Sequence, residues 1–315
     1  MLHKVKYRRL GASGLDVSVI GLGGNTFGGT VDGDDAVAVV RHALDSGISF
    51  IDTADIYSRG RSEELIGRGI AGRRDEVVLA TKLRHPMGES IYQGGLSRRW
   101  MVRAVEDSLR RLQTDYIDLY QAHAPDDATP LEETLRAMDD LVRAGKVRYV
   151  GCSNYAAWEL ATALGISRCH GLAPWVSVQP RWNLLEGLDD PTLLPACRRL
   201  GAGMIPYTPL ASGLLTGKYR RGQEPPPGTR FGDMARLRGR LTEDKLATVD
   251  RLRDWAEARG HTVGELAVAW LLAHPEVSTV IIGARTPQQV TENLRPASWE
   301  LTPAERDEVA ALAAS

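Results

Sequence analysis

The stretch FIDTADIY, Phe50–Tyr57, decides how the rest of this chain is interpreted. A short apolar run, residues 48–51, stops at the carboxylate of Asp52, and Tyr57 follows in a polar loop. An apolar strand that ends on a charged side chain is typical of the rim of an α/β active site. The same stretch is also consistent with a solvent-facing strand end that a structural Asp caps, so the rest of the chain has to decide.

The same pattern, an apolar strand with a polar end before a helix, recurs along the chain. Residues 5–20 predict a β-hairpin, after which the strand Val17–Ile20 enters a glycine-dense loop. With the strands ending at Ile20 and Asp52, eight β units are present, which predicts a single (β/α)8 TIM barrel over residues 1–315. The other six strands end in Thr81-Lys82, Gln121–His123, Gly151–Asn154, Gln179, Tyr207–Leu210 and Gly283–Arg285.

A doubly wound parallel sheet is the alternative architecture for such an alternation. That fold announces its cofactor with the pattern G-x-G-x-x-G after the first strand. Residues 21–24 do not fit the pattern, because Thr26 stands where the third glycine belongs. We therefore favour the barrel, with a long loop after its seventh strand, Ala211–Glu243, interpreted as a lid over the rim.

The composition excludes several function classes. The 315 residues include 39 basic and 40 acidic side chains, a net charge of -1, which gives no argument for nucleic acid or membrane as a partner. No apolar run approaches the roughly 18 residues of a membrane span, and the N-terminal residues lack the apolar core of a signal peptide. The three separated cysteines (Cys152, Cys169, Cys197) predict buried thiols in a reducing cytoplasm, without a disulfide framework or a metal site.

Four side chains form a candidate proton-transfer group. Since the C-terminal ends of barrel strands converge, Asp52, Lys82 and His123 should meet at one rim, with Tyr57 in the adjacent loop. A tyrosine pKa lies near 10, and a neighbouring lysine ammonium would lower it. We expect Asp52 to hold Lys82 and His123 to hydrogen-bond a substrate oxygen. Taken singly, each residue also has a structural explanation, and Lys82 alone is consistent with the Schiff-base lysine of an aldolase.

These stretches resemble the aldo-keto reductase family, in particular its bacterial and potassium-channel-β-subunit-like branch. FIDTADIY, LATK and LYQAH are similar to the contexts of that family's four catalytic residues. The resemblance implies a TIM barrel that reduces an aldehyde or ketone with NADPH, Tyr57 being the general acid and no metal being required. A regulatory subunit that binds NADPH and turns over slowly is the alternative. The other similar stretches are Asp107–Tyr120, Leu141–Tyr155, Tyr207–Tyr219 and Ile281–Asn293.

The resemblance also implies the cofactor contacts. Ser153, Asn154 and Gln179 match positions that bind the nicotinamide amide, and Tyr207 matches the aromatic residue that stacks on its ring. The remaining matching positions are Gly24 and Asp52; Thr208, Pro209, Leu210, Gly213 and Lys218 near the pyrophosphate; Arg230; and Gly283, Arg285, Gln289, Glu292 and Asn293 near the adenosine.

Two departures from the family pattern bear on specificity. Gly283-Ala284 and Gln289 stand where many members carry Lys-Ser and Arg around the 2′-phosphate, so Arg285 is the expected replacement and NADH stays possible. Asn25 replaces a bulky aromatic residue, which predicts a roomier or more polar pocket. The expected substrate residues are Asn25, Tyr57, Arg84 and His123. The sequence leaves open the natural substrate, the physiological direction and the oligomeric state.

Overall fold

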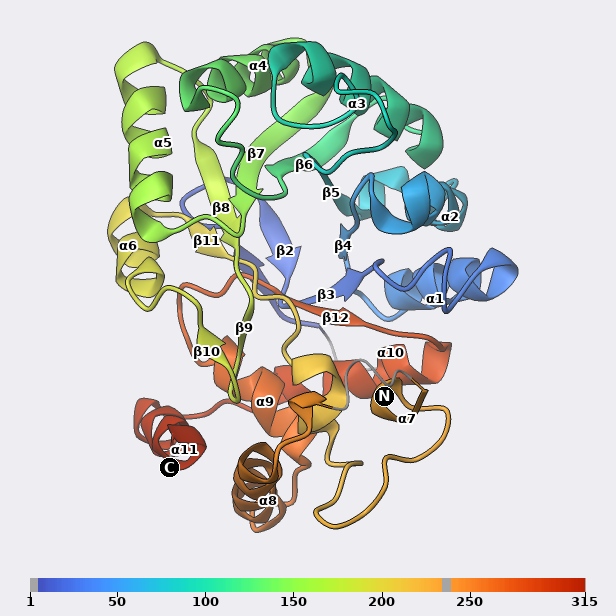
Figure 1. The fold of residues 1–315 in the computed structure, drawn as a ribbon, viewed down its shortest axis with the longest axis vertical. Helices are drawn as coiled ribbons and strands as arrows, with labels where there is room; N and C mark the ends of the chain where they lie inside the picture. The colour runs from blue at the N-terminus through green and yellow to red at the C-terminus, as the bar shows by residue number, and fades with distance from the viewer. Residues whose placement is uncertain (1–4, 234–238, 315) are drawn as a thin grey trace.

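Eight parallel strands form the central sheet, which curls into a barrel in the computed structural model (Figure 1). The structure describes residues 5–233 and 239–314. Neighbouring strands follow the order β11-β8-β7-β6-β5-β4-β3-β12. Their bounds are β3 Ile20–Gly23, β4 Phe50–Asp52, β5 Val78–Leu83, β6 Ile117–Ala122, β7 Val147–Ser153, β8 Trp175–Gln179, β11 Gly203–Met204 and β12 Val280–Gly283.

Hydrogen bonds between the β11 segment and the segment that leads into β12 close the barrel. The Met204 amide donates to the carbonyl oxygen of Glu276 at 2.8 Å, and the Ser278 amide donates to that of Met204 at 2.9 Å. Further along, the Ile281 amide donates to the Pro206 carbonyl oxygen at 3.0 Å. The strand alternation therefore predicted the (β/α)8 barrel correctly, and its strand ends converge on one face.

Helices follow the strands and cover the outside of the barrel (Figure 1). In α3, Ser97 accepts a hydrogen bond from the Trp100 amide as N-cap, and an apolar stripe from Trp100 to Leu112 packs inward. The helical periodicity of residues 98–112 in the sequence predicts the same bounds. The helices are α1 Gly33–Asp45, α2 Arg61–Ile70, α3 Arg98–Leu112, α4 Leu131–Arg143, α5 Ala157–His170, α6 Leu193–Leu200, α7 Arg230–Asp233, α8 Glu243–Glu257, α9 Val263–Leu272, α10 Pro287–Leu294 and α11 Pro303–Ala314.

The first barrel strand differs from the sequence prediction. Residues Val17–Ile20 do not form one strand, because β2 (Asp16–Ser18) belongs to the hairpin and β3 begins at Ile20. The supposed loop glycines Gly21 and Gly23 lie within β3. A Cβ atom at Gly21 would come within 2.8 Å of the Phe50 ring, so the glycine leaves room for an aromatic side chain inside the barrel.

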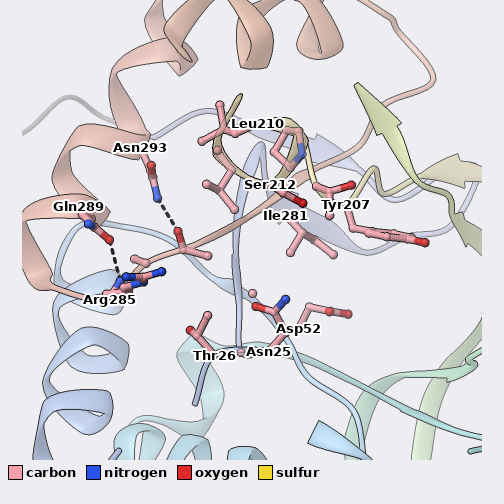
Figure 2. Close-up of a pocket in the computed structure, with 18 of the residues that line it drawn as sticks. Asn25, Thr26, Asp52, Tyr207, Leu210, Ser212, Ile281, Arg285, Gln289 and Asn293 are labelled. Carbon is pink, nitrogen blue, oxygen red and sulfur yellow. Dashed lines mark hydrogen bonds between the residues drawn. The ribbon is translucent and has the colours of Figure 1, made fainter. Parts of the chain in front are cut away.

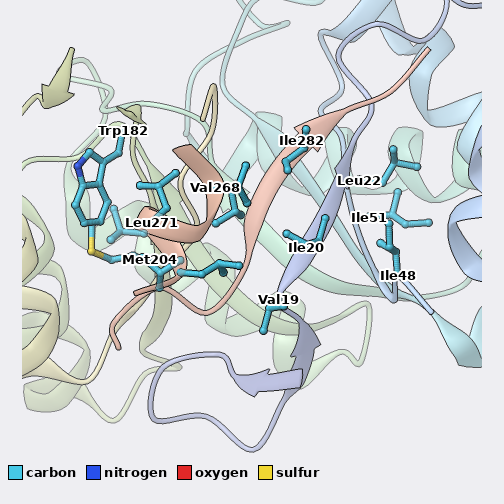
Figure 3. Packing of buried hydrophobic residues seen from close by; sticks show 14 of the residues in the cluster. Val19, Ile20, Leu22, Ile48, Ile51, Trp182, Met204, Val268, Leu271 and Ile282 are labelled. Carbon is cyan, nitrogen blue, oxygen red and sulfur yellow. The ribbon is translucent and has the colours of Figure 1, made fainter. Parts of the chain in front are cut away.

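The hydrophobic core has two layers. The larger layer lies between the strands and the surrounding helices, and Figure 3 shows part of it from Val19 to Ile51 and from Trp182 to Ile282. The smaller layer fills the barrel interior and comprises Leu10, Val17, Phe50, Ala80, Leu119, Ile205 and Ile281. Leu10 and Val17 come from the predicted hairpin, β1 (Tyr7–Arg9) with β2, which therefore plugs one end of the barrel.

The segment after β11 is more ordered than the predicted loop. It contains the 3-10 helix η3 (Ala211–Thr216) and α7, while residues 234–238 lie outside the described part of the chain. A small unpredicted hairpin, β9 (Trp182–Asn183) with β10 (Gly187–Leu188), precedes it. Within residues 5–233 and 239–314, no helix is long and apolar enough to cross a membrane, and no cluster of three His, Cys, Asp or Glu side chains forms a metal site.

Candidate active site

A cavity of about 500 Å³ lies at the C-terminal ends of the barrel strands. Its wall is built from the ends of β3, β4, β7, β8 and β12 and from the loops that follow them. Figure 2 shows Asp52 and Tyr207 toward one end of the cavity and Arg285, Gln289 and Asn293 toward the other. The cavity is therefore elongated, with chemically distinct ends.

A buried ion pair lies beneath one end of the cavity. The Lys82 Nζ atom is 2.6 Å from Asp52 Oδ2 and 2.7 Å from the carbonyl oxygen of Thr53. Lys82 has no solvent-exposed surface, and Asp52 is almost fully buried. The other carboxylate oxygen, Asp52 Oδ1, accepts hydrogen bonds from the side-chain amides of Gln179 at 2.9 Å and Gln121 at 3.3 Å.

The ion pair keeps Lys82 positively charged. Burial by itself lowers the pKa of Lys82, but the Asp52 carboxylate and Tyr57 outweigh it, so the pKa is raised above its ordinary value. An ammonium therefore stands behind the cavity at every physiological pH.

Tyr57 lines the cavity directly above this ammonium. Its ring centroid is 5.2 Å from Lys82 Nζ. The turn that follows is strained, since Ser58 and Arg59 have φ angles of 48° and 54° in the left-handed region. The Ser58 hydroxyl anchors the turn by donating to the Phe27 carbonyl oxygen at 3.0 Å.

The pKa of Tyr57 differs in direction from the sequence expectation. Burial raises the pKa of Tyr57 by more than the nearby Lys82 charge lowers it, so the pKa lies above its ordinary value. The phenol is thus protonated at neutral pH, which is the state that a proton donor requires.

His123 is neutral and enclosed by two aromatic rings. Its ring centroid lies 5.8 Å from that of Tyr57 and 4.6 Å from that of His85. Burial, with smaller contributions from Lys82, His85 and Arg84, lowers the pKa of His123 to about 2. Its Nδ1 atom is buried and has no hydrogen-bond partner among the described residues. An unpaired buried N–H costs more than an unpaired acceptor, so we infer that the proton resides on Nε2.

Polar side chains connect the end of β7 to the neighbouring loops. The Asn154 side-chain amide donates to the His123 carbonyl oxygen at 2.8 Å, and its oxygen accepts from the Tyr207 hydroxyl at 2.7 Å. The Ser153 hydroxyl donates to the Gln179 carbonyl oxygen at 2.9 Å. These contacts give a rigid polar wall beside His123, with Asn154 itself at a φ of 61°.

The turn after Tyr207 has an unusual backbone. Thr208, Ala211 and Ser212 have φ angles of 54°, 46° and 60°, and such residues cost of order 1–3 kcal/mol each. The Thr208 hydroxyl oxygen is buried without a hydrogen-bond partner in the described chain, although Thr208 lines the cavity. Strain and an unpaired hydroxyl in one turn are typical of a ligand clamp, because a bound group can satisfy what the protein leaves unpaired.

The far end of the cavity is basic. Arg285 lies at this end with Arg230 nearby, Lys218 also lines the cavity, and none of the three has a carboxylate partner within the residues that the structure describes. Burial lowers the pKa of Arg230, and the nearby Arg285 lowers it further. The Gln289 side-chain oxygen accepts from the Arg285 amide at 2.8 Å, as Figure 2 shows. Uncompensated cations of this kind are suited to phosphate.

Comparison with known proteins identifies the family. The sequence profile of the Aldo/keto reductase family matches residues 19–314. The chain belongs to this family. It is 37% identical over 299 residues to a probable voltage-gated potassium channel subunit beta from Oryza sativa subsp. japonica, covering 92% of this chain and 90% of that protein.

Other relatives of this aldo/keto reductase carry enzyme names. The uncharacterized oxidoreductase YrpG of Bacillus subtilis is 37% identical over 302 residues, covering 92% of this chain and 90% of that protein. The versiconal hemiacetal acetate reductase of Aspergillus parasiticus is 33% identical over 327 residues, covering 96% and 95%. The chain is therefore an NADP-dependent oxidoreductase of a family that generally uses NADP(H).

The structure brings most of the predicted site residues to this one cavity. Every position predicted to contact the cofactor lines it, as do Asn25, Tyr57 and His123. Lys82 lies beneath the cavity. Arg84 is absent from the lining, because its Nε atom donates to the Pro125 carbonyl oxygen at 3.1 Å.

Sequence reasoning missed several residues of the reductase site. Gln121 donates to Asp52, and strand periodicity signals it, since Gln121 lies two residues before His123 on the same face. Thr26 lines the cavity from a loop, and Ser212 and Thr216 line it from the short, kinked 3-10 helix η3, so neither segment carries a periodic signal.

Proposed function

We propose that this aldo/keto reductase reduces an aldehyde or ketone to an alcohol with NADPH, Tyr57 being the general acid. One observation supports this assignment above the others. A protonated phenol lines the cavity directly above a buried ammonium, and that ammonium is fixed by a carboxylate at 2.6 Å. This arrangement suits a tyrosine that must give up a proton and then regain it.

Each of the four polar residues then has a defined task. Tyr57 donates its proton to the carbonyl oxygen as negative charge develops there, and the Lys82 ammonium stabilises the phenolate left behind. Asp52 keeps Lys82 charged and in place. His123, neutral and protonated on Nε2, donates a hydrogen bond to the same oxygen and orients it. The reduced nicotinamide, when bound, supplies the hydride.

The residues present fit NADPH. Lys218, Arg230 and Arg285 offer three cations without carboxylate partners in the described chain, which suits the pyrophosphate and a 2′-phosphate. The hydroxyl groups of Thr208 and Thr26 also line the cavity, and both are buried without a hydrogen-bond partner in the described chain. These two hydroxyl groups support a polar ligand in the cavity. We infer that Arg285, with Arg230, favours NADPH over NADH.

The remaining cofactor positions take the roles that the family resemblance implies. We assign the nicotinamide amide to Ser153, Asn154 and Gln179, and stacking on its ring to Tyr207. The adenosine end of the cofactor would lie against Gly283, Gln289, Glu292 and Asn293. The other predicted contact residues that line the cavity are Gly24, Asp52, Pro209, Leu210 and Gly213. Asn25 would contact the substrate beside Tyr57 and His123.

Replacement of the tyrosine tests the proposal. Loss of reduced-nicotinamide absorbance is followed with a panel of aldehydes for the wild type, Tyr57→Phe and the matched control Tyr92→Phe, in which the altered tyrosine is exposed. We expect kcat to fall by about 10²–10⁴-fold in Tyr57→Phe alone, with the Kd for NADPH unchanged. Equal rates in all three proteins would refute the role of Tyr57.

A regulatory subunit that binds NADPH is the second candidate function. The similarity to proteins named potassium channel subunit beta in rice and in Arabidopsis thaliana favours it. Tight NADPH binding without turnover of any carbonyl compound in the same assay would support this alternative. The complete set of Asp52, Tyr57, Lys82 and His123 favours the enzyme.

The aldolase alternative is disfavoured by the protonation state of Lys82. A Schiff-base lysine must present a free amine, but the pKa of Lys82 is raised because Asp52 and Tyr57 outweigh burial. Borohydride in the presence of a carbonyl substrate should therefore trap no covalent adduct.

We also propose that the enzyme works in the cytoplasm. Cys152, Cys169 and Cys197 are all unpaired, which suits a reducing compartment, although Cys169 is exposed where the sequence analysis expected a buried thiol.

A further inference from the structure

Asp55 is a buried carboxyl group for which the proposed mechanism has no use. It lies in the turn between Asp52 and Tyr57, and only 1% of its surface is exposed. Neither of its oxygens accepts a well-formed hydrogen bond from the described residues. The hydroxyl group of Tyr120, on strand β6, is also buried and finds no hydrogen-bond partner in the described part of the chain. Two orphaned polar groups behind an active site require an explanation.

The nearby cation Arg111 is paired with a different acidic residue, Glu63. Glu63 on α2 accepts a hydrogen bond from Arg111 Nε at 2.7 Å and another from the Thr81 hydroxyl at 2.6 Å. Arg111 Nη2 lies 2.6 Å from Glu63 Oε2, the oxygen that also accepts from Arg111 Nε. Because Glu63 pairs with Arg111 in this way, Asp55 has no cation in direct contact among residues 5–233 and 239–314, and the Glu63 carboxylate repels a second negative charge.

The charged form of Asp55 is therefore disfavoured. Burial raises the pKa of Asp55 to about 8, and the Glu63 charge adds to the rise, while the Ile56 amide, Arg111 and Lys82 oppose it. An isolated buried carboxylate costs several kcal/mol, whereas the neutral acid costs much less, so the group takes up a proton instead.

Asp55 is adjacent to the residues assigned to proton transfer. Its amide donates to the carbonyl oxygen of Lys82 at 3.1 Å, so the two backbones are directly joined. The carboxyl group is within electrostatic reach of Tyr57 and Lys82 as well as of Tyr120. The titratable groups facing it are thus Tyr57 from η1 (Tyr57–Gly60), Lys82 from β5, Tyr120 from β6, Glu63 from α2 and Arg111 from α3.

We propose that Asp55 is a positioning residue for the Tyr57–Lys82 pair, held in the fold as a neutral carboxylic acid whose deprotonation adds a negative charge behind that pair. This role rests on the proposed reductase function. The negative charge would raise the pKa of Tyr57 and hold its proton more tightly, as the sign of their interaction requires. Proton donation by Tyr57 therefore weakens as the pH rises through the titration of Asp55.

Infrared spectroscopy tests the protonation state without any turnover. The wild type, labelled with ¹³C at its aspartate carboxyl groups, is compared with Asp55→Asn and with the control Asp34→Asn, whose carboxyl group is exposed. We expect a carboxylic acid band at about pH 6 that is lost at about pH 9 and is missing only in Asp55→Asn, since ordinary aspartates ionise near 4. Its absence from the wild type at the lower pH would overturn the proposal.

The pH dependence of kcat tests the coupling. In the wild type, kcat should fall about tenfold between about pH 7 and pH 9. The neutral fraction of Asp55, whose pKa is raised to about 8, falls by about that factor over this range. Asp55→Asn should change less than about twofold over the same range, and Asp34→Asn should follow the wild type. Identical profiles in the wild type and Asp55→Asn would overturn the positioning role even with the infrared band present.

Failure of the underlying function would look different. Absence of turnover in the wild type, with the infrared band intact, would refute the reductase proposal and with it the role of Asp55 in proton transfer. A missing band with normal turnover would instead refute only the inference about Asp55. The absence of the band from the wild type would overturn the proposal whether or not Asp55→Asn folds, and circular dichroism of Asp55→Asn checks the fold on which the assignment of the band depends.

Discussion

Replacing Lys82 with methionine removes the cation of the buried pair while nearly keeping the side-chain volume. The Asp52 carboxylate then loses its partner at 2.6 Å in a site with almost no exposure to solvent. Removing one partner of a buried ion pair typically costs about 3–5 kcal/mol, because the other charge stays buried and unpaired.

The surroundings of Asp52 reduce this cost. Gln179 and Gln121 still donate hydrogen bonds to Asp52 Oδ1, at 2.9 and 3.3 Å. A hydrogen bond to a charged group contributes about 1.5–3 kcal/mol, so these two bonds partly stabilise the unpaired carboxylate. We therefore expect Lys82→Met to lower the free energy of unfolding by about 3 kcal/mol, the lower end of the range for breaking a buried ion pair. Asp52→Asn should cost a similar amount, since the buried Lys82 ammonium would lose its carboxylate and keep neutral acceptors such as the Thr53 carbonyl oxygen.

The double variant distinguishes electrostatics from packing. Asp52→Asn/Lys82→Met lacks both charges of this buried pair, so it should cost at least about 2 kcal/mol less than the sum of the single variants. Urea unfolding followed by circular dichroism measures all four proteins. We expect kcat to be lost in each variant, including the stable double variant, by about 10³-fold or more.

Additive costs in the double variant would contradict the reasoning, since the pair would then contribute no coupling energy. Single-variant costs below about 1 kcal/mol would contradict it too, because they would indicate that water reaches both charges. Retained activity in the stable double variant would show that the cation does not assist Tyr57.

Three further variants test other parts of the structure. Arg285→Ala should raise the Kd for NADPH by about 10–100-fold and that for NADH by less than threefold, measured by fluorescence titration, and equal changes would refute phosphate recognition. Burial lowers the pKa of His274 to about 4 from 6.5, so the fold binds fewer protons than the unfolded chain between these values, and stability falls as the pH drops through this window. His274→Gln should reduce that loss, of about 3 kcal/mol, in urea unfolding at about pH 4 relative to pH 7, and an unchanged loss would exclude His274 as its source. Gly11→Ala should destabilise by more than about 2 kcal/mol, because its Cβ would lie 2.5 Å from Gly201 and Gly203 backbone atoms. Gly72→Ala, where nothing lies within 4 Å of the Cβ, should cost clearly less, and equal costs would show that backbone strain alone matters.

The sequence alone determined the architecture and the inventory of polar groups. The apolar runs that stop at Asp52, Lys82 and His123 can be recognised as strands from the sequence, because the length, periodicity and end of a strand depend on residues that are neighbours in the chain. The parallel sheet then brings these ends together, whatever the side chains around them. For the same reason, the cofactor positions inferred from motifs line one cavity. Glycine was the exception, because Gly21 resembles a loop residue until Phe50 is seen to occupy the space beside it.

Only the tertiary structure decided the charges and the competition for partners. The pKa of Tyr57 rises because burial outweighs Lys82, and burial is a property of the whole fold. Arg84 donates to the Pro125 carbonyl oxygen and does not line the cavity, which no local pattern signals. Glu63 pairs with Arg111, 48 residues further along the chain, so that among the described residues Asp55 has no cation in direct contact. Electrostatic energies depend on distance and desolvation in space, so a sequence names the groups but does not rank them.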